Sequence, residues 1–157
     1  MSVYVIGIDP GKKGSITALD KRGAFAGSVR FDRDTPLDVV GWLRSLQAGG
    51  GIVFASMEKV GAMPGNGGTS MFKFGVSTGW CHGILDALGI PWELVTPTKW
   101  QRGMACLNGG NKNITKAAAQ RLWPDERPSP RGITQDDADG MLIAEYARRL
   151  AVERGLV

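Results

Sequence analysis

Short apolar runs separated by turn residues dominate the first part of the chain. The first run covers residues 3–9 and ends at Asp9-Pro10-Gly11, and two further runs cover residues 15–19 and 24–31. Runs of this length, bounded by glycine, proline and charged turn residues, are typical of strands. The pattern predicts three strands joined by short turns in an antiparallel meander.

A helical spacing of apolar residues then replaces the short runs. It predicts a helix over residues 36–46, with Thr35 as its cap and Pro36 in its first turn. Residues 52–57 form another apolar run, which predicts a buried strand with Glu58 at its end. A glycine-rich loop is predicted over residues 61–68.

The second half of the chain alternates helical and extended patterns. The predicted elements are a helix over residues 70–88, a strand over 92–95, a helix starting at Thr96-Pro97, a helix over 114–123, a loop over 126–132 and a helix over 136–153. The predicted order is β-β-β-α-β-α-β-α-α. This order indicates one α/β domain over residues 1–157, with a mixed five-stranded sheet and helices on both faces.

Three glycines recur every four residues in the predicted helix over residues 70–88. Gly75, Gly79 and Gly83 therefore share one face of that helix. Each glycine costs a helix roughly 1 kcal/mol relative to alanine, so three on one face suggest that another backbone approaches closely. Two interpretations remain open: the stripe packs on the sheet of the same chain, or it lies at a subunit interface.

Composition narrows the location and the class of partner. The chain has a net charge of +4 and a pI near 9.3, which suits a polyanionic partner without requiring one. No apolar run approaches the roughly 20 residues that span a bilayer. The first residues lack a basic region and a cleavage site, so we expect no signal peptide, no membrane association and a cytoplasmic protein.

Soft metal ligands are scarce. Cys81 and Cys106 form no paired motif, and His82 is the single histidine. The expected role of each cysteine is a small buried hydrophobe, and His82 is expected to be structural or exposed. These residues give no basis for a zinc site.

Four carboxylates are the main candidates for chemistry. Asp9 and Glu58 each end a predicted buried strand, where a charge is costly unless it is paired or binds a cation. Asp136 and Asp139 are spaced i, i+3 and share one face at the start of the last helix. Oxygen ligands without cysteine or histidine favour Mg²⁺ or Mn²⁺, and two such ions can drive phosphodiester hydrolysis.

Each acid also has a purely structural interpretation. Asp9 could make a turn, Glu58 could pair with Lys59 or a distant arginine, and Asp136 and Asp139 could cap their helix. Asp137 is expected to be a solvated cap residue, because its helix angle points away from the Asp136/Asp139 face. The clustering of all four acids at element ends favours a metal site.

Several blocks of the sequence, in order, resemble the RuvC-type Holliday-junction resolvases, which have the RNase H-like fold. The matching blocks, between about residues 3 and 148, are Gly7-Ile8-Asp9-Pro10-Gly11, Met57-Glu58, Met63-Pro64-Gly65, Ser70-Met71-Phe72-Lys73-Phe74-Gly75, Thr96-Pro97-Thr98-Lys99-Trp100-Gln101 and Asp136-Asp137-Ala138-Asp139. The lysine-bearing helix that ends at Leu122-Trp123-Pro124 is similar to the phage branch. Gly140 departs from the family, which usually has alanine there, and some relatives carry histidine in place of Asp136.

The resemblance implies a magnesium-dependent endonuclease with Asp9, Glu58, Asp136 and Asp139 as ligands of two ions. It also implies a homodimer that nicks opposed strands of a four-way DNA junction and leaves 5′-phosphate and 3′-hydroxyl ends. Lys112 matches the lysine that assists catalysis in the family.

Further residues are candidates for contacting DNA. Lys116 is a candidate phosphate contact, although a solvated helix face explains it equally well. Phe72 and Phe74 could stack on bases at a branch point or pack in the core, and Lys73 lies between them. Trp42, Trp80 and Trp100 are expected in the core.

Two other functions compete with a nuclease. A junction-binding protein with a dead site is one, although all four acids are present. An actin-like phosphotransferase is the other, because its first strand also ends in Asp-x-Gly, but 157 residues are too few for the duplicated domains that enclose ATP.

Overall fold

A computed structural model describes residues 1–61 and 64–157 of the chain. Its elements, in order, are β1 (Tyr4–Asp9), β2 (Ser15–Asp20), β3 (Phe25–Arg30), α1 (Pro36–Ala48), β4 (Ile52–Glu58), α2 (Gly68–Ala87), β5 (Trp92–Val95), α3 (Pro97–Gly103), α4 (Lys112–Leu122) and α5 (Gln135–Glu153). All three helices predicted after the last strand are present, so the written order β-β-β-α-β-α-β-α-α is one helix short of the predicted ranges and of the structure. Met63 of the Met63-Pro64-Gly65 block lies outside the described residues.

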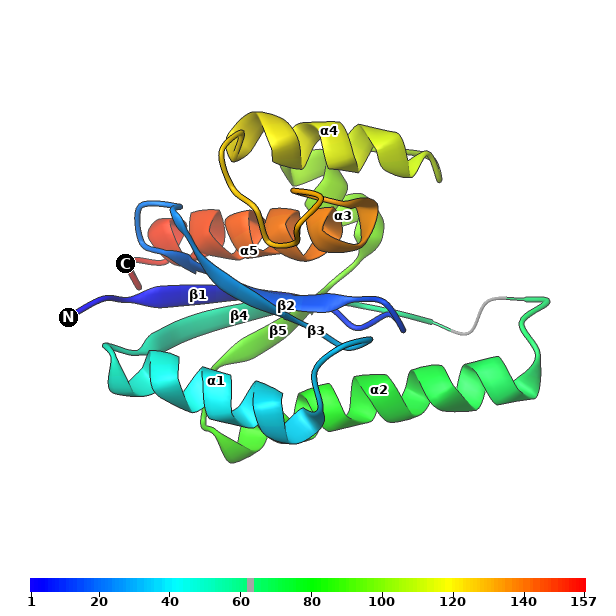
Figure 1. Ribbon diagram of the computed structural model, residues 1–157, viewed down its shortest axis with the longest axis horizontal. Coiled ribbons are helices and arrows are strands. Elements are labelled where there is room, and N and C mark those ends of the chain that lie inside the picture. Colours follow the sequence, from blue (N-terminus) through cyan, green and yellow to red (C-terminus); the bar gives the residue numbers. More distant parts are fainter. Residues whose placement is uncertain (62–63) are drawn as a thin grey trace.

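The five strands form one mixed sheet in the order β3-β2-β1-β4-β5. The meander β1-β2-β3 is antiparallel, as predicted, while β4 and β5 run parallel to β1 and to each other. As a result, the carboxyl ends of β1, β3, β4 and β5 all lie at one edge of the sheet. Figure 1 shows this edge on the right.

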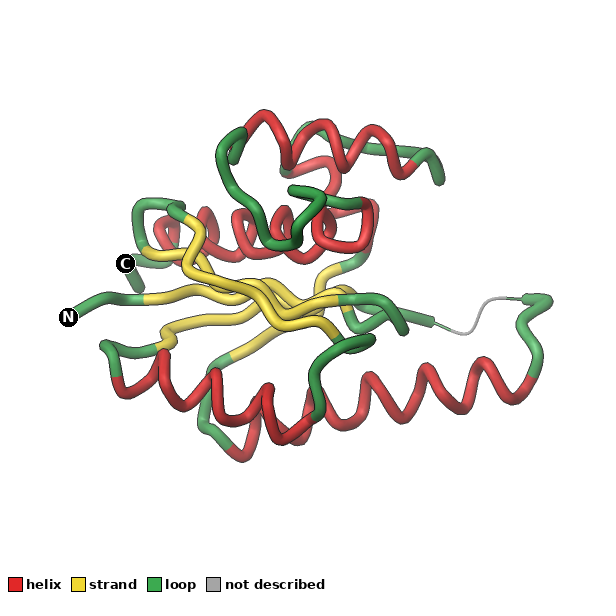
Figure 2. Tube along the Cα trace, viewed as in Figure 1, coloured by secondary structure: helices red, strands yellow, loops and turns green. Residues whose placement is uncertain are grey.

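Helices cover both faces of the sheet, which confirms the predicted α/β architecture. Helices α1 and α2 lie on one face, and α5 lies on the other with α3 and α4 outside it (Figure 1). The start of α2 extends beyond the sheet (Figure 2). No helix in the described ranges combines the length and apolarity that a membrane span requires.

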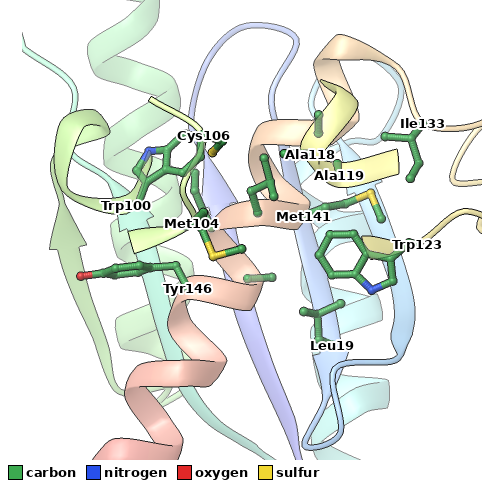
Figure 3. Packing of buried hydrophobic residues seen from close by; sticks show 14 of the residues in the cluster. Leu19, Trp100, Met104, Cys106, Ala118, Ala119, Trp123, Ile133, Met141 and Tyr146 are labelled. Carbon is green, nitrogen blue, oxygen red and sulfur yellow. The ribbon is translucent and has the colours of Figure 1, made fainter. Parts of the chain in front are cut away.

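Each face has its own hydrophobic core. The α5 face contains the cluster drawn in Figure 3, in which Trp100 and Met104 of the α3 region pack with Met141 and Tyr146 of α5. The opposite core includes Trp42 and Trp80, which are half-buried. Trp100 is fully buried, so the prediction of core packing is confirmed for it and holds in part for the other two.

Helix α5 packs directly on β1 because two glycines remove side chains from the contact. A Cβ atom on Gly7 would overlap the backbone nitrogen of Ala144, and one on Gly140 would overlap the hydroxyl of Ser15. Glycine at position 140, where alanine is usual in RuvC-type resolvases, is thus explained by the neighbouring Ser15. The close approach brings the first turns of α5 to the end of β1.

Candidate metal centre

Asp9 and Glu58 lie side by side at the ends of the two central strands. Ile8 of β1 pairs with Met57 of β4, so the next residue of each strand is the acid. Ile8 and Met57 face the α1/α2 core, and side chains alternate along a strand, so both acids face α5. The predicted convergence of these two strand ends is present in the structure.

Asp139 joins them from α5. It is 8% exposed, and its Oδ1 atom is buried without a hydrogen-bond partner in the described residues. The other carboxylate oxygen, Oδ2, lies 3.6 Å from the Nζ atom of Lys112, which is the first residue of α4. A buried carboxylate oxygen without a partner is costly, and it is available to a cation.

The three acids repel one another in a buried setting, and their pKa values record this. Burial, followed by repulsion from Asp139, raises the pKa of Asp9 to about 6. Burial, followed by repulsion from Asp9, raises the pKa of Glu58 to about 7. Burial also raises the pKa of Asp139, and Lys112 opposes that rise. Burial is thus the main reason why the pKa of each of these carboxyls lies above its ordinary value, and Lys112 offsets only part of the rise.

Two of the structural interpretations can now be compared with the geometry. The Oδ1 atom of Asp9 accepts a hydrogen bond of 3.1 Å from the backbone N–H of Gly11, so Asp9 does make a turn while it faces the other acids. Glu58 forms no ion pair with Lys59 or an arginine in the described ranges. Its Oε2 atom instead accepts a hydrogen bond of 2.7 Å from the indole N–H of Trp100.

Asp137 is where the sequence-based prediction is wrong. It does belong to the helix cap, because its Oδ2 accepts hydrogen bonds from the backbone and hydroxyl of Thr134. It is not solvated, however: it is 2% exposed, and its Oδ1 lies 2.9 Å from Nη1 of Arg30. Thr134 and Asp137 form the cap, so Asp136 and Asp139 are free of the capping role. Asp137 is engaged on both oxygens and is a poor candidate ligand.

Arg30 is a residue whose role the sequence did not reveal. It ends β3 at the same sheet edge and is 6% exposed. Its guanidinium contacts Asp32 at 3.1 Å, Asp137 at 2.9 Å and Asp136 at 3.4 Å. Arg30 thereby fixes the first turn of α5 to β3. The available signal was a charged residue at the end of a predicted strand, as for Asp9 and Glu58.

The donor chemistry of the cluster fits a hard divalent cation. Asp9, Glu58 and Asp139 supply only oxygen donors, with Asp136 more exposed beside them. Within residues 1–61 and 64–157, no three acidic, histidine or cysteine side chains already stand close enough to hold an ion. The orphaned Oδ1 of Asp139 and the raised carboxyl pKa values nevertheless indicate uncompensated negative charge, which Mg²⁺ or Mn²⁺ would neutralise. Both cysteines are buried, as expected.

The predicted DNA contacts divide into those near the acids and those farther away. Lys112 meets Asp139, whereas Lys116, farther along α4, makes no ion pair within the described part of the chain. Phe72 is 74% exposed, so core packing is excluded for it. Phe74 is half-buried and lines a cleft together with Lys73.

This cleft, called the larger cleft below, opens beside Glu58 and has a volume of about 780 Å³. Lys12, Lys59 and Lys73 provide positive charge around it, and Phe31, Phe74 and Trp80 provide aromatic surface. A cleft with both properties, next to an acidic cluster, has the chemistry of a groove for unpaired nucleotides.

Comparison with solved structures finds the same fold in RuvC of Thermus thermophilus. T. thermophilus RuvC in complex with Holliday junction substrate aligns with a TM-score of 0.59 at 15% identity, over 98% of this chain and 96% of that chain. A second Thermus thermophilus RuvC structure aligns with a TM-score of 0.60 at 18% identity, over 97% and 96%. No protein-family model and no curated protein matches the sequence. The chain therefore has the RNase H-like fold in its RuvC form.

Proposed function

We propose that this protein is a metal-dependent, structure-selective DNA endonuclease that resolves four-way junctions by paired nicks. The observation that carries the proposal is the meeting of Asp9, Glu58 and Asp139 from three separate elements, with one carboxylate oxygen left without a partner. The RuvC-like fold supports the choice of substrate, because one structure of that fold is bound to a Holliday junction.

The acids would hold two Mg²⁺ ions, with Mn²⁺ as a substitute, and Asp136 is the fourth candidate ligand. Ions held by these acids would supply a nucleophilic water and would stabilise the leaving oxygen of the phosphodiester, and the expected products carry 5′-phosphate and 3′-hydroxyl ends. Lys112 would pair with a non-bridging phosphate oxygen. Its position next to Asp139 supports this role, because the acid holds the ammonium group at the site.

The DNA near the cut would lie in the larger cleft. Phe74 and the exposed Phe72 would stack on bases that the junction leaves unpaired, and Lys73 would contact the backbone between them. Lys116 would contact a phosphate farther along α4. A groove that accepts unpaired bases would favour a junction over an intact duplex.

A homodimer follows from the same proposal, because paired nicks need two sites. The face of α2 that carries Gly75, Gly79 and Gly83 supports this assembly. A Cβ atom added to any of the three glycines meets no atom of residues 1–61 or 64–157 within 4 Å, so the stripe does not pack on the sheet. Val76 exposes an apolar surface on the same helix. A second copy of the chain would cover this surface.

The decisive experiment mixes the purified protein with a four-way DNA junction and Mg²⁺. The wild type should produce paired nicks, and Asp9→Asn should produce none while it still binds the junction. Asp125→Asn is the matched control, since Asp125 is an exposed aspartate that makes no hydrogen bond or ion pair in the described chain. Junction binding by the wild type without cutting in Mg²⁺ or Mn²⁺ would instead identify a binding protein with a dead site.

A further inference from the structure

A second, smaller cleft adjoins the acidic cluster at Asp136, whereas the larger cleft adjoins it at Glu58. It has a volume of about 340 Å³ and lies between the β1–β2 turn, the β3–α1 loop and the loop before α5. Asp136 lines it, so the cleft borders the candidate metal centre directly. None of the residues assigned to DNA contact in the proposed function lines this cleft.

Positive charge dominates its lining. Four of its nine lining residues are cationic and two are acidic. Arg30 is already engaged with three carboxylates, so it acts as a scaffold there. Lys13, Arg33 and Arg131 form no ion pair within 4.0 Å in the described ranges. Three cations thus converge from three loops without a carboxylate partner.

We propose that this cleft, named here the basic cleft, binds a backbone phosphate of the DNA strand that lies across the acidic cluster. Cations gathered around one cleft repel one another unless an anion lies between them. Two arginines present planar donor forks that match the oxygens of a phosphate. None of the described residues that line the basic cleft is aromatic, so the cleft suits the DNA backbone rather than the bases.

The β1–β2 turn contributes to both clefts. Lys12 lines the larger cleft and Lys13 lines the basic cleft, although they are consecutive residues. The turn begins directly after Asp9. A strand whose scissile phosphate lies at the acids therefore has aromatic surface on one side and a phosphate subsite on the other. Because the two clefts differ in chemistry, they would fix which end of the strand lies on which side of the cut.

The inference rests on the proposed nuclease function and specifies which part of the substrate is held. Its test compares two doubly substituted proteins with equal net charge. Arg33→Gln/Arg131→Gln removes charge from the basic cleft. Arg22→Gln/Arg44→Gln removes the same charge from exposed positions that line neither cleft. Both are measured for junction affinity across a range of salt concentrations and for cutting in Mg²⁺.

The basic-cleft variant should bind the junction roughly tenfold more weakly, given the strength of hydrogen bonds between charged groups. The slope of log affinity against log salt should become shallower by about 1 to 2 for the lost phosphate contacts. The control variant should change both quantities much less. Arg33→Lys/Arg131→Lys should restore the salt slope, because it keeps the charge while changing the donor geometry.

A chemical probe locates the phosphate itself. Junctions with a single uncharged methylphosphonate linkage, moved stepwise along the cut strand, should bind the wild type weakly at one position near the cut. That loss should vanish in the basic-cleft variant and persist in the control variant. The subsite would be overturned if the two variants had equal affinities and salt slopes. It would also be overturned if every methylphosphonate linkage that weakens binding of the wild type weakened binding of the basic-cleft variant equally. Neither result would contradict the cutting of junctions. A wild type that neither binds nor cuts junctions would overturn the proposed function and the subsite together.

Discussion

Glycines lie on both faces of the sheet, in contacts of opposite kinds. On the α5 face, neighbouring atoms occupy the space that a side chain at Gly7 or Gly140 would need. The backbone of α5 therefore lies directly against the backbone of β1. On the α2 face, a Cβ atom added to Gly75, Gly79 or Gly83 would meet no atom within 4 Å in the part of the chain that the structure describes. The comparison shows that the same residue type allows close packing beside the acidic cluster in one place and leaves a helix face uncovered by the described residues in the other.

The largest effect is expected where the backbones touch. Gly7→Ala places a methyl group onto the backbone of Ala144, which cannot yield as a side chain can. The free energy of unfolding should fall by about 3 kcal/mol or more, as measured by urea denaturation. A loss below about 1 kcal/mol would mean that α5 moves away from β1 with little cost, contrary to the close packing described.

A similar loss is expected at the buried arginine on the same face. Arg30→Gln leaves Asp137 buried without its ion pair, which should cost about 3 kcal/mol of unfolding free energy. It should also loosen the first turn of α5 and weaken Mn²⁺ binding measured by calorimetry. Arg30→Lys should recover part of both losses. Unchanged metal binding in Arg30→Gln would show that Arg30 stabilises the fold without positioning the acids.

The buried acids on the α5 face give stability a characteristic pH dependence. The pKa of Glu58 is about 7 when folded, above its ordinary value of 4.5, so the folded state holds this proton over a range in which the unfolded state has lost it. Stability from this group is therefore present at low pH and falls as pH rises from about 4.5 to 7. In metal-free buffer, the advantage of Glu58→Gln over the wild type should grow by about 2 kcal/mol between about pH 5 and pH 8.

Asp38 on the opposite face provides the control of opposite sign. Hydrogen bonds from Thr35 hold the pKa of Asp38 below its usual value, so its contribution is present at neutral pH and is lost as pH falls. The loss of unfolding free energy in Asp38→Asn should therefore be largest at neutral pH and should shrink as the pH falls. The gain in Glu58→Gln should likewise shrink as the pH falls, so the two substitutions shift stability in opposite directions at neutral pH. Thermal melts at a series of pH values would measure both. A pH-independent difference for Glu58→Gln would contradict the burial of its charge.

The smallest effect is expected on the exposed stripe. Gly79→Ala should stabilise the isolated subunit by up to about 1 kcal/mol, since alanine favours the helix and no atom obstructs its methyl group. The same change should weaken self-association if the stripe is the dimer contact, which sedimentation velocity would measure. A more stable protein with unchanged association would place the dimer contact elsewhere on the surface.

Much of this arrangement could be predicted from local patterns. Apolar runs and turn residues gave the strands, and the parallel pairing of two strand ends brought Asp9 and Glu58 together. The spacing of Asp136 and Asp139 correctly placed both at the start of one helix. The short helix α3 was predicted from its Thr96 cap and Pro97 rather than from periodicity, which seven residues cannot show.

The surroundings of Asp137 and the setting of the glycines could not be predicted in this way. Asp137 is buried by Arg30, a partner 107 residues away in sequence, and helix angle alone gives no information about such a contact. Likewise, a stripe of glycines has the same pattern whether the opposing surface is present or absent. Both properties depend on tertiary neighbours that a single sequence does not specify.

The packing of α5 on β1 also sets the order in which the acidic cluster can assemble during synthesis. Asp9 and Glu58 leave the ribosome early, whereas Asp139 is made 130 residues after Asp9. At ordinary elongation rates this delay is roughly ten seconds or more. Until α5 docks, the face of β1 beneath it stays open to water, and its carboxylates retain ordinary acidity. A nascent chain thus has no complete acidic cluster until the last helix has been made and has packed on β1.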